Sequence, residues 1–121
     1  MGQVKIQKRI LVVTSDSNEM SIIKELLNKD KSVVLSASNG RAALDILRGT
    51  DVDVIVSEVG LPIMDGSTLH SICRSQTART KVPFIFFTDT SDLSITRDPN
   101  TFVLCKAKGI HQLAELIDTF G

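Results

Sequence analysis

Short apolar runs alternate with amphipathic segments along almost the whole chain, and this alternation constrains the fold more than any other feature. The runs are rich in Val, Ile, Leu and Phe, a composition typical of buried strands. They lie at residues 10–13, 33–35, 52–56, 84–87 and 102–105. Strands separated by segments long enough for a helix predict a parallel sheet, because such a connection returns the chain to the same end of the sheet.

The segments between the runs carry the signals of helices. Asp16, followed three residues later by Glu19, resembles a capping box. Asn39, and then Asp65 or Ser67, are suited to cap two further helices. Apolar residues fall on one helical face in these segments, namely Ile23, Leu26 and Leu27; Ala43, Leu44 and Leu47; Leu69, Ile72 and Cys73; and Ile110, Leu113, Ile117 and Phe120. Together with the five strands, they predict an α/β fold: a flavodoxin-like three-layer α/β/α sandwich, with a five-stranded parallel sheet of order 2-1-3-4-5.

One segment departs from this pattern. Between residues 89 and 100, Leu93 and Ile95 have the spacing of a strand rather than of a helix, and Pro99 follows. We therefore predict that the fourth helix is short or irregular.

Length and charge limit the classes of function. The chain has 121 residues, which predicts a single domain over residues 1–121. Its formal net charge of zero argues against binding to nucleic acid or to an anionic membrane. No apolar stretch approaches the roughly 18 residues of a membrane span, and no secretion signal is evident. Cys73 and Cys105 lie in apolar stretches and are interpreted as buried thiols of a cytoplasmic protein.

The chemistry is expected where the strands end, because parallel sheets of this order bind ligands at their carboxyl ends. Thr14, Ser15 and Asp16 follow the first strand, while Glu58, Thr88 and Lys106 follow or end the third, fourth and fifth. No nucleophile–base pair is evident, and no glycine-rich phosphate loop follows the first strand. We therefore expect no enzymatic activity, although a small α/β enzyme or ligand-binding domain remains an alternative.

The apolar runs and their flanking residues resemble the receiver domain of two-component response regulators over essentially the whole chain. The matching stretches are ILVV, DVDVIVSEVGLPIMDG, PFIFFT and CK. The resemblance implies a role in phosphorelay signalling. In that family, two acidic residues after the first strand and an aspartate after the third hold a divalent metal, and a histidine kinase phosphorylates that aspartate. A hydroxyl after the fourth strand and a lysine after the fifth contact the phosphoryl oxygens.

Thr88 and Lys106 match the family pattern, but other positions depart from it. Thr14 and Ser15 occupy the positions of the acidic pair, and both are neutral. Glu58 occupies the phosphoacceptor position, with its carboxylate one methylene, roughly 1.5 Å, further from the backbone. The aromatic residue that reports phosphorylation on the fifth strand is replaced by Val103, next to Phe102. Ala107 stands where proline is usual.

These departures predict a degenerate pseudo-receiver that signals without phosphorylation. We expect Mg²⁺ binding to be lost or weak, no other cofactor, and a direct ion pair between Lys106 and Glu58. Glu58 is interpreted as a degenerate acceptor kept as a partner for Lys106, with a phosphate mimic as the other interpretation. Asp16 is interpreted as a helix cap rather than a metal ligand, and Thr88 as a structural hydroxyl rather than a switch. A working acceptor that uses Glu58 or Asp16 remains an alternative.

The expected partners are signalling proteins or a covalently attached effector domain, and a homodimer is left open. The chain is then either a fragment of a longer signalling protein or a stand-alone adaptor. We predict that residues 89–100 form an altered contact surface. His70 and His111 are expected at the surface, and Arg74, Arg79 and Lys81 are expected to form a solvated basic patch.

Overall fold

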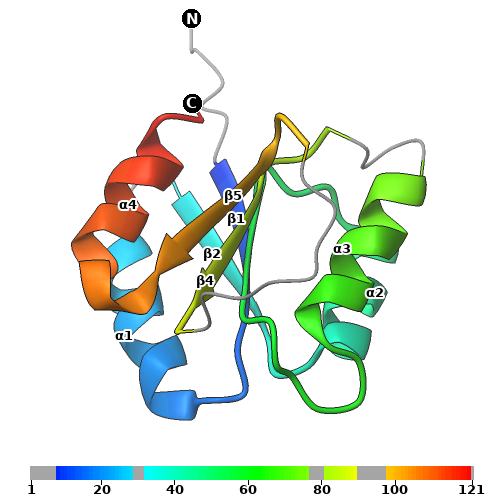
Figure 1. Cartoon of the computed structure of the whole chain (residues 1–121), viewed down its shortest axis with the longest axis horizontal. Coiled ribbons are helices and arrows are strands. Elements are labelled where there is room, and N and C mark those ends of the chain that lie inside the picture. Colours follow the sequence, from blue (N-terminus) through cyan, green and yellow to red (C-terminus); the bar gives the residue numbers. More distant parts are fainter. Residues whose placement is uncertain (1–7, 29–31, 77–80, 90–97, 121) are drawn as a thin grey trace, which may run out of the picture.

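The computed structural model describes residues 8–28, 32–76, 81–89 and 98–120. Five parallel strands form its sheet, in the order β2-β1-β3-β4-β5 (Figure 1). Their bounds are β1 Lys8–Val13, β2 Ser32–Ala37, β3 Val54–Ser57, β4 Phe84–Thr88 and β5 Thr101–Cys105. The predicted sheet and its strand order are therefore confirmed.

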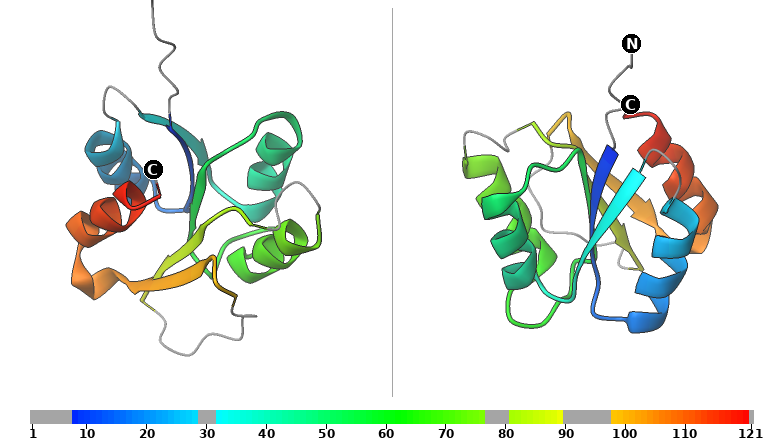
Figure 2. Two further views of the ribbon diagram at one scale, coloured as in Figure 1. Left: turned by 90° about the horizontal axis from the view of Figure 1, so that it is seen from above. Right: turned by 180° about the vertical axis from the view of Figure 1, so that it is seen from behind.

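Helices cover both faces of the sheet, as predicted. The bounds are α1 Ser17–Leu27, α2 Gly40–Gly49, α3 Gly66–Ser75 and α4 Ile110–Asp118, with a short 3₁₀ turn, η2, at Lys106–Lys108. Helices α1 and α4 lie on one face, and α2 and α3 lie on the other (Figure 2). The side chains of Asp16, Asn39 and Asp65 cap α1, α2 and α3 by accepting hydrogen bonds from backbone N–H groups.

Two apolar layers hold the helices to the sheet, because successive side chains of a strand point to opposite faces. In β1, Ile10 and Val12 face α1 and α4, whereas Leu11 and Val13 face α2 and α3. β3 and β4 lie inside the sheet, and all their residues are buried. This packing fixes the strand ends and thereby the site that they carry.

The sequence predictions for residues 90–97, for the two cysteines and for membrane spans have different outcomes. Residues 90–97, on which the prediction of an irregular fourth helix and contact surface rests, lie outside the described residues. Cys73 is buried as expected, but the prediction was wrong for Cys105, which is exposed because it is the last residue of the edge strand β5. Within the described part of the chain, no helix combines the length and apolar character needed to cross a membrane.

Candidate functional site

The carboxyl end of the sheet brings together a lysine and two glutamates. Nζ of Lys106, just after β5, lies 2.7 Å from Oε2 of Glu58, just after β3. The predicted ion pair is therefore present. The same Nζ also lies 2.8 Å from Oε2 of Glu19, in the first turn of α1. All three side chains are mostly buried.

The two carboxylates change the acid–base properties of the lysine. Burial by itself lowers the pKa of the Lys106 ammonium, because the charged form is desolvated. Hydrogen bonds to Glu19 and Glu58 oppose this effect and outweigh it, so the pKa of Lys106 is raised above its usual value. The lysine is thus firmly charged and acts as the cation of the site.

Thr14 completes the site from the end of β1. Its side-chain hydroxyl donates a hydrogen bond to Oε1 of Glu58. Its oxygen also accepts a hydrogen bond from the backbone N–H of Asp16 at 3.2 Å. Thr14 is buried, whereas Ser15, the other residue at the position of the acidic pair, is exposed. Both oxygens of Glu58 are therefore engaged, one by a hydroxyl and the other by an ammonium.

Glu19 is the site residue that sequence reasoning missed. Its spacing from Asp16 was interpreted as a capping box, in which Glu19 would bond back to the N–H of Asp16. In the structure only Asp16 caps, by accepting hydrogen bonds from Asn18 N and Glu19 N at 2.9 and 3.1 Å. The available signal was position: the first turn of a helix that follows β1 lies at the same end of the sheet as Glu58 and Lys106.

These residues do not fit the Mg²⁺ ion that the resemblance implies. Mg²⁺ requires several hard anionic oxygens in octahedral geometry. Thr14 and Ser15 supply neutral hydroxyls, and the ammonium of Lys106 already occupies the carboxylate of Glu58. The crevice between Thr14, Glu19, Glu58 and Phe87 has essentially no free volume. Among the described residues, no group of three or more His, Cys, Asp or Glu is arranged to hold a metal.

Thr88, Phe102 and Val103 occupy the places that the sequence assigned to them. Thr88 is buried at the carboxyl end of β4, and its register partner in β5 is Cys105. Val103 packs in the layer with α2 and α3. Phe102 points the other way, and its ring lies 5.1 Å from that of Phe120. The side chains of Phe102 and Val103 therefore pack on opposite faces of the sheet.

The loop from β3 to α3 presses closely on the backbone of Glu58. Gly66 N donates to Val59 O at 2.8 Å, and a Cβ at Gly66 would overlap with the carbonyl oxygen of Glu58. Gly40 N donates to Met64 O at 2.9 Å, so the start of α2 holds the same loop. The motif LPIMDG thus fixes the backbone that carries Glu58.

Ile63, in this loop, has a backbone conformation that is unfavourable for its side chain. Its φ is 67°, in the left-handed region, and the residue is 82% exposed. We expect Ile63→Asn to raise the free energy of unfolding by about 1 kcal/mol, because asparagine tolerates this region and little burial is lost. Urea unfolding measures the change. Ile22→Asn, at the exposed Ile22 of α1, is the control and should give no gain; equal effects at both positions would contradict the strain explanation.

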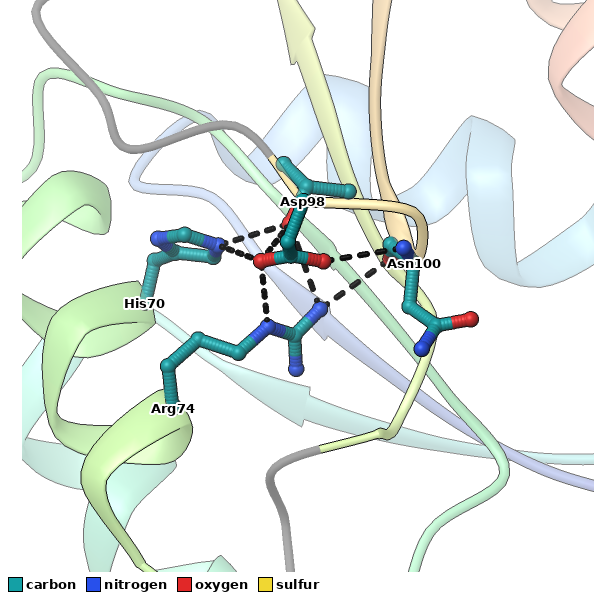
Figure 3. A network of polar contacts seen from close by, with 5 residues as sticks. His70, Arg74, Asp98 and Asn100 are labelled. Atoms are coloured by element: carbon teal, nitrogen blue, oxygen red, sulfur yellow. Dashed lines mark hydrogen bonds and ion pairs between the residues drawn. The ribbon is translucent and has the colours of Figure 1, made fainter.

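A second polar network lies near the amino end of β5 (Figure 3). Nε2 of His70 lies 2.8 Å from the hydroxyl oxygen of Thr101 and 3.6 Å from Oδ2 of Asp98. Nε of Arg74 donates to the same Oδ2 at 2.8 Å, and Nη2 donates to Asn100 O at 3.0 Å. The network therefore joins α3 to the chain that enters β5.

This network corrects two sequence predictions. His70 is 1% exposed, with the rings of Phe84 and Phe86 beside it, and is not a surface residue. Arg74 is largely buried in its ion pair with Asp98 and does not belong to a solvated patch. Lys81 and His111 are exposed, as expected, and Arg79 lies outside the described residues. The partner of His70 and Arg74 is distant in sequence, so helical spacing alone did not reveal it.

The pKa shifts of this network follow from its contacts. Burial lowers the pKa of His70, and the positive charge of Arg74 lowers it further, against the attraction of Asp98. For Asp98, burial would raise the pKa, but hydrogen bonds from Arg74, Thr101 and Asn100 N outweigh it and hold the pKa at about 2. Asp98 is thus an anion and His70 a neutral ring at neutral pH.

Comparison with known proteins gives one family. A family model described as the response regulator receiver domain matches residues 10–99. Two curated proteins with similar sequences are a protein-glutamate methylesterase/protein-glutamine glutaminase 1 of Syntrophomonas wolfei, 34% identical over 88 residues, and the two-component response regulator-like APRR5 of Arabidopsis thaliana, 32% identical over 113 residues. The matches cover 70% and 87% of this chain, but only 24% and 18% of those proteins.

Solved structures with the same fold include receiver domains. The signal receiver domain of a signal transduction histidine kinase from Syntrophus aciditrophicus superposes with a TM-score of 0.83 at 26% identity, over 93% of this chain and 89% of that one. The chemotaxis response regulator CheY4 of Vibrio cholerae gives a TM-score of 0.80 at 20% identity, over 95% of this chain and 99% of that one, which shows the fold alone.

Proposed function

This chain belongs to the response regulator receiver domain family, and we propose that it is an atypical receiver that acts through protein contacts without being phosphorylated. The observation that supports this proposal is the state of Glu58. Its two oxygens are held by Thr14 and Lys106, and the lysine that would meet a phosphoryl group is already paired with two carboxylates. Phosphoryl transfer needs a metal to neutralise the transferring group, and the neutral Thr14 and Ser15 offer poor support for one.

We propose signalling proteins or an attached effector domain as the partners. The two curated relatives named above are several times longer than their matched segments, which supports a receiver that works with further domains. We also propose a cytoplasmic location, supported by the free and exposed thiol of Cys105.

Incubation with a small phosphoryl donor and Mg²⁺ is expected to leave the mass of the protein unchanged. Glu58→Asp alone should also gain no phosphoryl group, because Thr14 and Ser15 remain neutral. Intact-mass spectrometry measures the change, with peptide mapping for any modified residue. A phosphoryl group on Glu58 or Asp16 of the natural sequence would overturn the proposal and favour a working acceptor with an unusual acid.

A triple variant provides the control for this experiment. Thr14→Asp, Ser15→Asp and Glu58→Asp together restore the three acids of the family pattern. We expect this variant to bind Mg²⁺ more tightly than the natural protein in a metal titration, because three carboxylates can then share the ion. Equally tight Mg²⁺ binding by Glu58→Asp alone would contradict the assignment of the missing charge to Thr14 and Ser15.

A further inference from the structure

We propose that Glu19 is a positioning residue that holds the ammonium of Lys106 against Glu58 and thereby keeps the site closed. This inference rests on the proposed function, in which the site is closed rather than awaiting a phosphoryl group. It assigns to α1 a part in setting the state of the site.

The geometry places Lys106 between two anions from different elements. Glu19 approaches from α1 and Glu58 from the end of β3, and each has one oxygen within 2.8 Å of Nζ. The ring of Phe87 lies beneath, with its centroid 6.0 Å from Nζ. Lysine is long and flexible, so a single partner leaves it many conformations. Contacts from two sides restrict the ammonium to one place.

Thr14 makes this arrangement possible. In a capping box, the carboxylate of Glu19 would accept a hydrogen bond from Asp16 N. Here Asp16 N donates instead to Oγ1 of Thr14, and Oγ1 in turn donates to Glu58. The helix end is thus satisfied without the side chain of Glu19, which is free to turn toward Lys106. A neutral hydroxyl at residue 14 therefore both fixes Glu58 and releases Glu19.

Charge balance points to positioning rather than to stability as the role of Glu19. One carboxylate is enough to neutralise one ammonium, and Glu58 already supplies it. The second carboxylate gives the cluster a net negative charge, and Oε1 of Glu19 is buried without a hydrogen-bond donor among the described residues. Burying a charged group in this way is costly. What Glu19 adds is a second contact, which restricts the ammonium of Lys106 to its place against Glu58.

Competitive acetylation of the full chain with trace acetic anhydride tests this role. The readout is the labelling rate of Lys106 divided by that of Lys24, an exposed lysine of the same molecule, obtained by peptide mass spectrometry. Glu19→Gln keeps the shape of the side chain and removes its charge. We expect it to raise the ratio severalfold, because loss of this carboxylate removes one of the two contacts that raise the pKa of Lys106 and so increases the fraction of free amine. Because Lys24 is already exposed, its rate corrects only for the amount of reagent, and a general loosening of the fold is detected separately as a loss of stability in urea unfolding.

Two further variants complete the design. Glu25→Gln changes an exposed glutamate of the same helix and should leave the ratio unchanged. Glu58→Gln removes the other partner. A ratio that rises in Glu58→Gln but stays within about twofold of the natural protein in Glu19→Gln would overturn the proposal, because Glu58 alone would then hold Lys106. Phosphoryl incorporation is measured separately, so failure of the proposed function and failure of this inference give different results.

Discussion

Replacement of Asp98 by alanine is expected to lower the free energy of unfolding by about 3 kcal/mol at neutral pH. The carboxylate of Asp98 accepts hydrogen bonds from Arg74, Thr101 and Asn100 N. Its removal breaks the ion pair with the guanidinium of Arg74. The side chain of Arg74 is only 14% exposed, so water compensates little for the lost partner. The network also ties α3 to the start of β5, so both elements lose an anchor.

The effect of this substitution should depend on pH. The pKa of Asp98 is about 2 in the folded protein and near its ordinary value of 3.8 in the unfolded chain. The carboxylate therefore contributes about 2 kcal/mol of stability, which is present above pH 4 and lost as the pH falls toward 2. His70 changes the stability with pH in the same direction. Its pKa is lowered in the folded protein, so the stability falls as the pH drops below the ordinary pKa of histidine.

Urea unfolding from neutral to acid pH measures both effects. The stability gap between the natural protein and Asp98→Ala should narrow by about 2 kcal/mol as Asp98 becomes protonated. Asp45→Ala is the matched control, because Asp45 pairs with Arg41 and Arg48 at the exposed surface of α2. Its effect should stay below about 1 kcal/mol. A gap for Asp98→Ala that does not change with pH would contradict the assigned role of the carboxylate.

A methyl group at residue 66 is expected to be similarly damaging, for a steric reason. In Gly66→Ala the new Cβ would overlap with Glu58 O and would lie 2.8 Å from Oγ of Ser57. Glu58 N donates a hydrogen bond to Val13 O, and Glu58 O accepts one from Ser57 Oγ. The backbone of Glu58 therefore has little freedom to move away from a new methyl group. We expect a loss of about 3 kcal/mol in the free energy of unfolding.

The same substitution should disturb the site as well as the fold. A shift of the Glu58 backbone would separate its carboxylate from Lys106, so the acetylation ratio of Lys106 to Lys24 should rise along with the loss in stability. Gly49→Ala is the matched control, since a Cβ there meets nothing within 4 Å and alanine favours the helix. An equal loss in both variants would show that close contact at Gly66 is not the cause.

The fold was predictable because local signals agreed with the global pattern. Apolar runs such as residues 10–13 and 84–87 had the composition of buried strands, and Asp16, Asn39 and Asp65 marked helix starts where the structure has them. The η2 turn was missed because three residues without a cap carry no periodic signal. The burial of Cys105 was wrongly predicted because an apolar run does not reveal that its last residue lies at the open end of an edge strand.

The site was predictable where the family pattern names a position, as at Glu58 and Lys106. Glu19 was missed because the same spacing suits a helix cap, and only the hydroxyl of Thr14 decides which partner the carboxylate takes. His70 was missed because its partners, Thr101 and Asp98, are close in space but about thirty residues away. Such contacts follow from tertiary structure, which periodicity does not describe.

The double role of the Thr14 hydroxyl has an evolutionary consequence. An aspartate at residue 14 alone would place a new carboxylate beside Glu58 and Glu19, with Lys106 as the cation between them. An aspartate at residue 58 alone would draw its carboxylate back from both Thr14 and Lys106. Either of these two single substitutions therefore weakens the present arrangement before a new one can form. Descendants of this sequence would thus need several substitutions together to regain phosphoryl chemistry. Substitutions on the outer surfaces, in contrast, can be accepted singly.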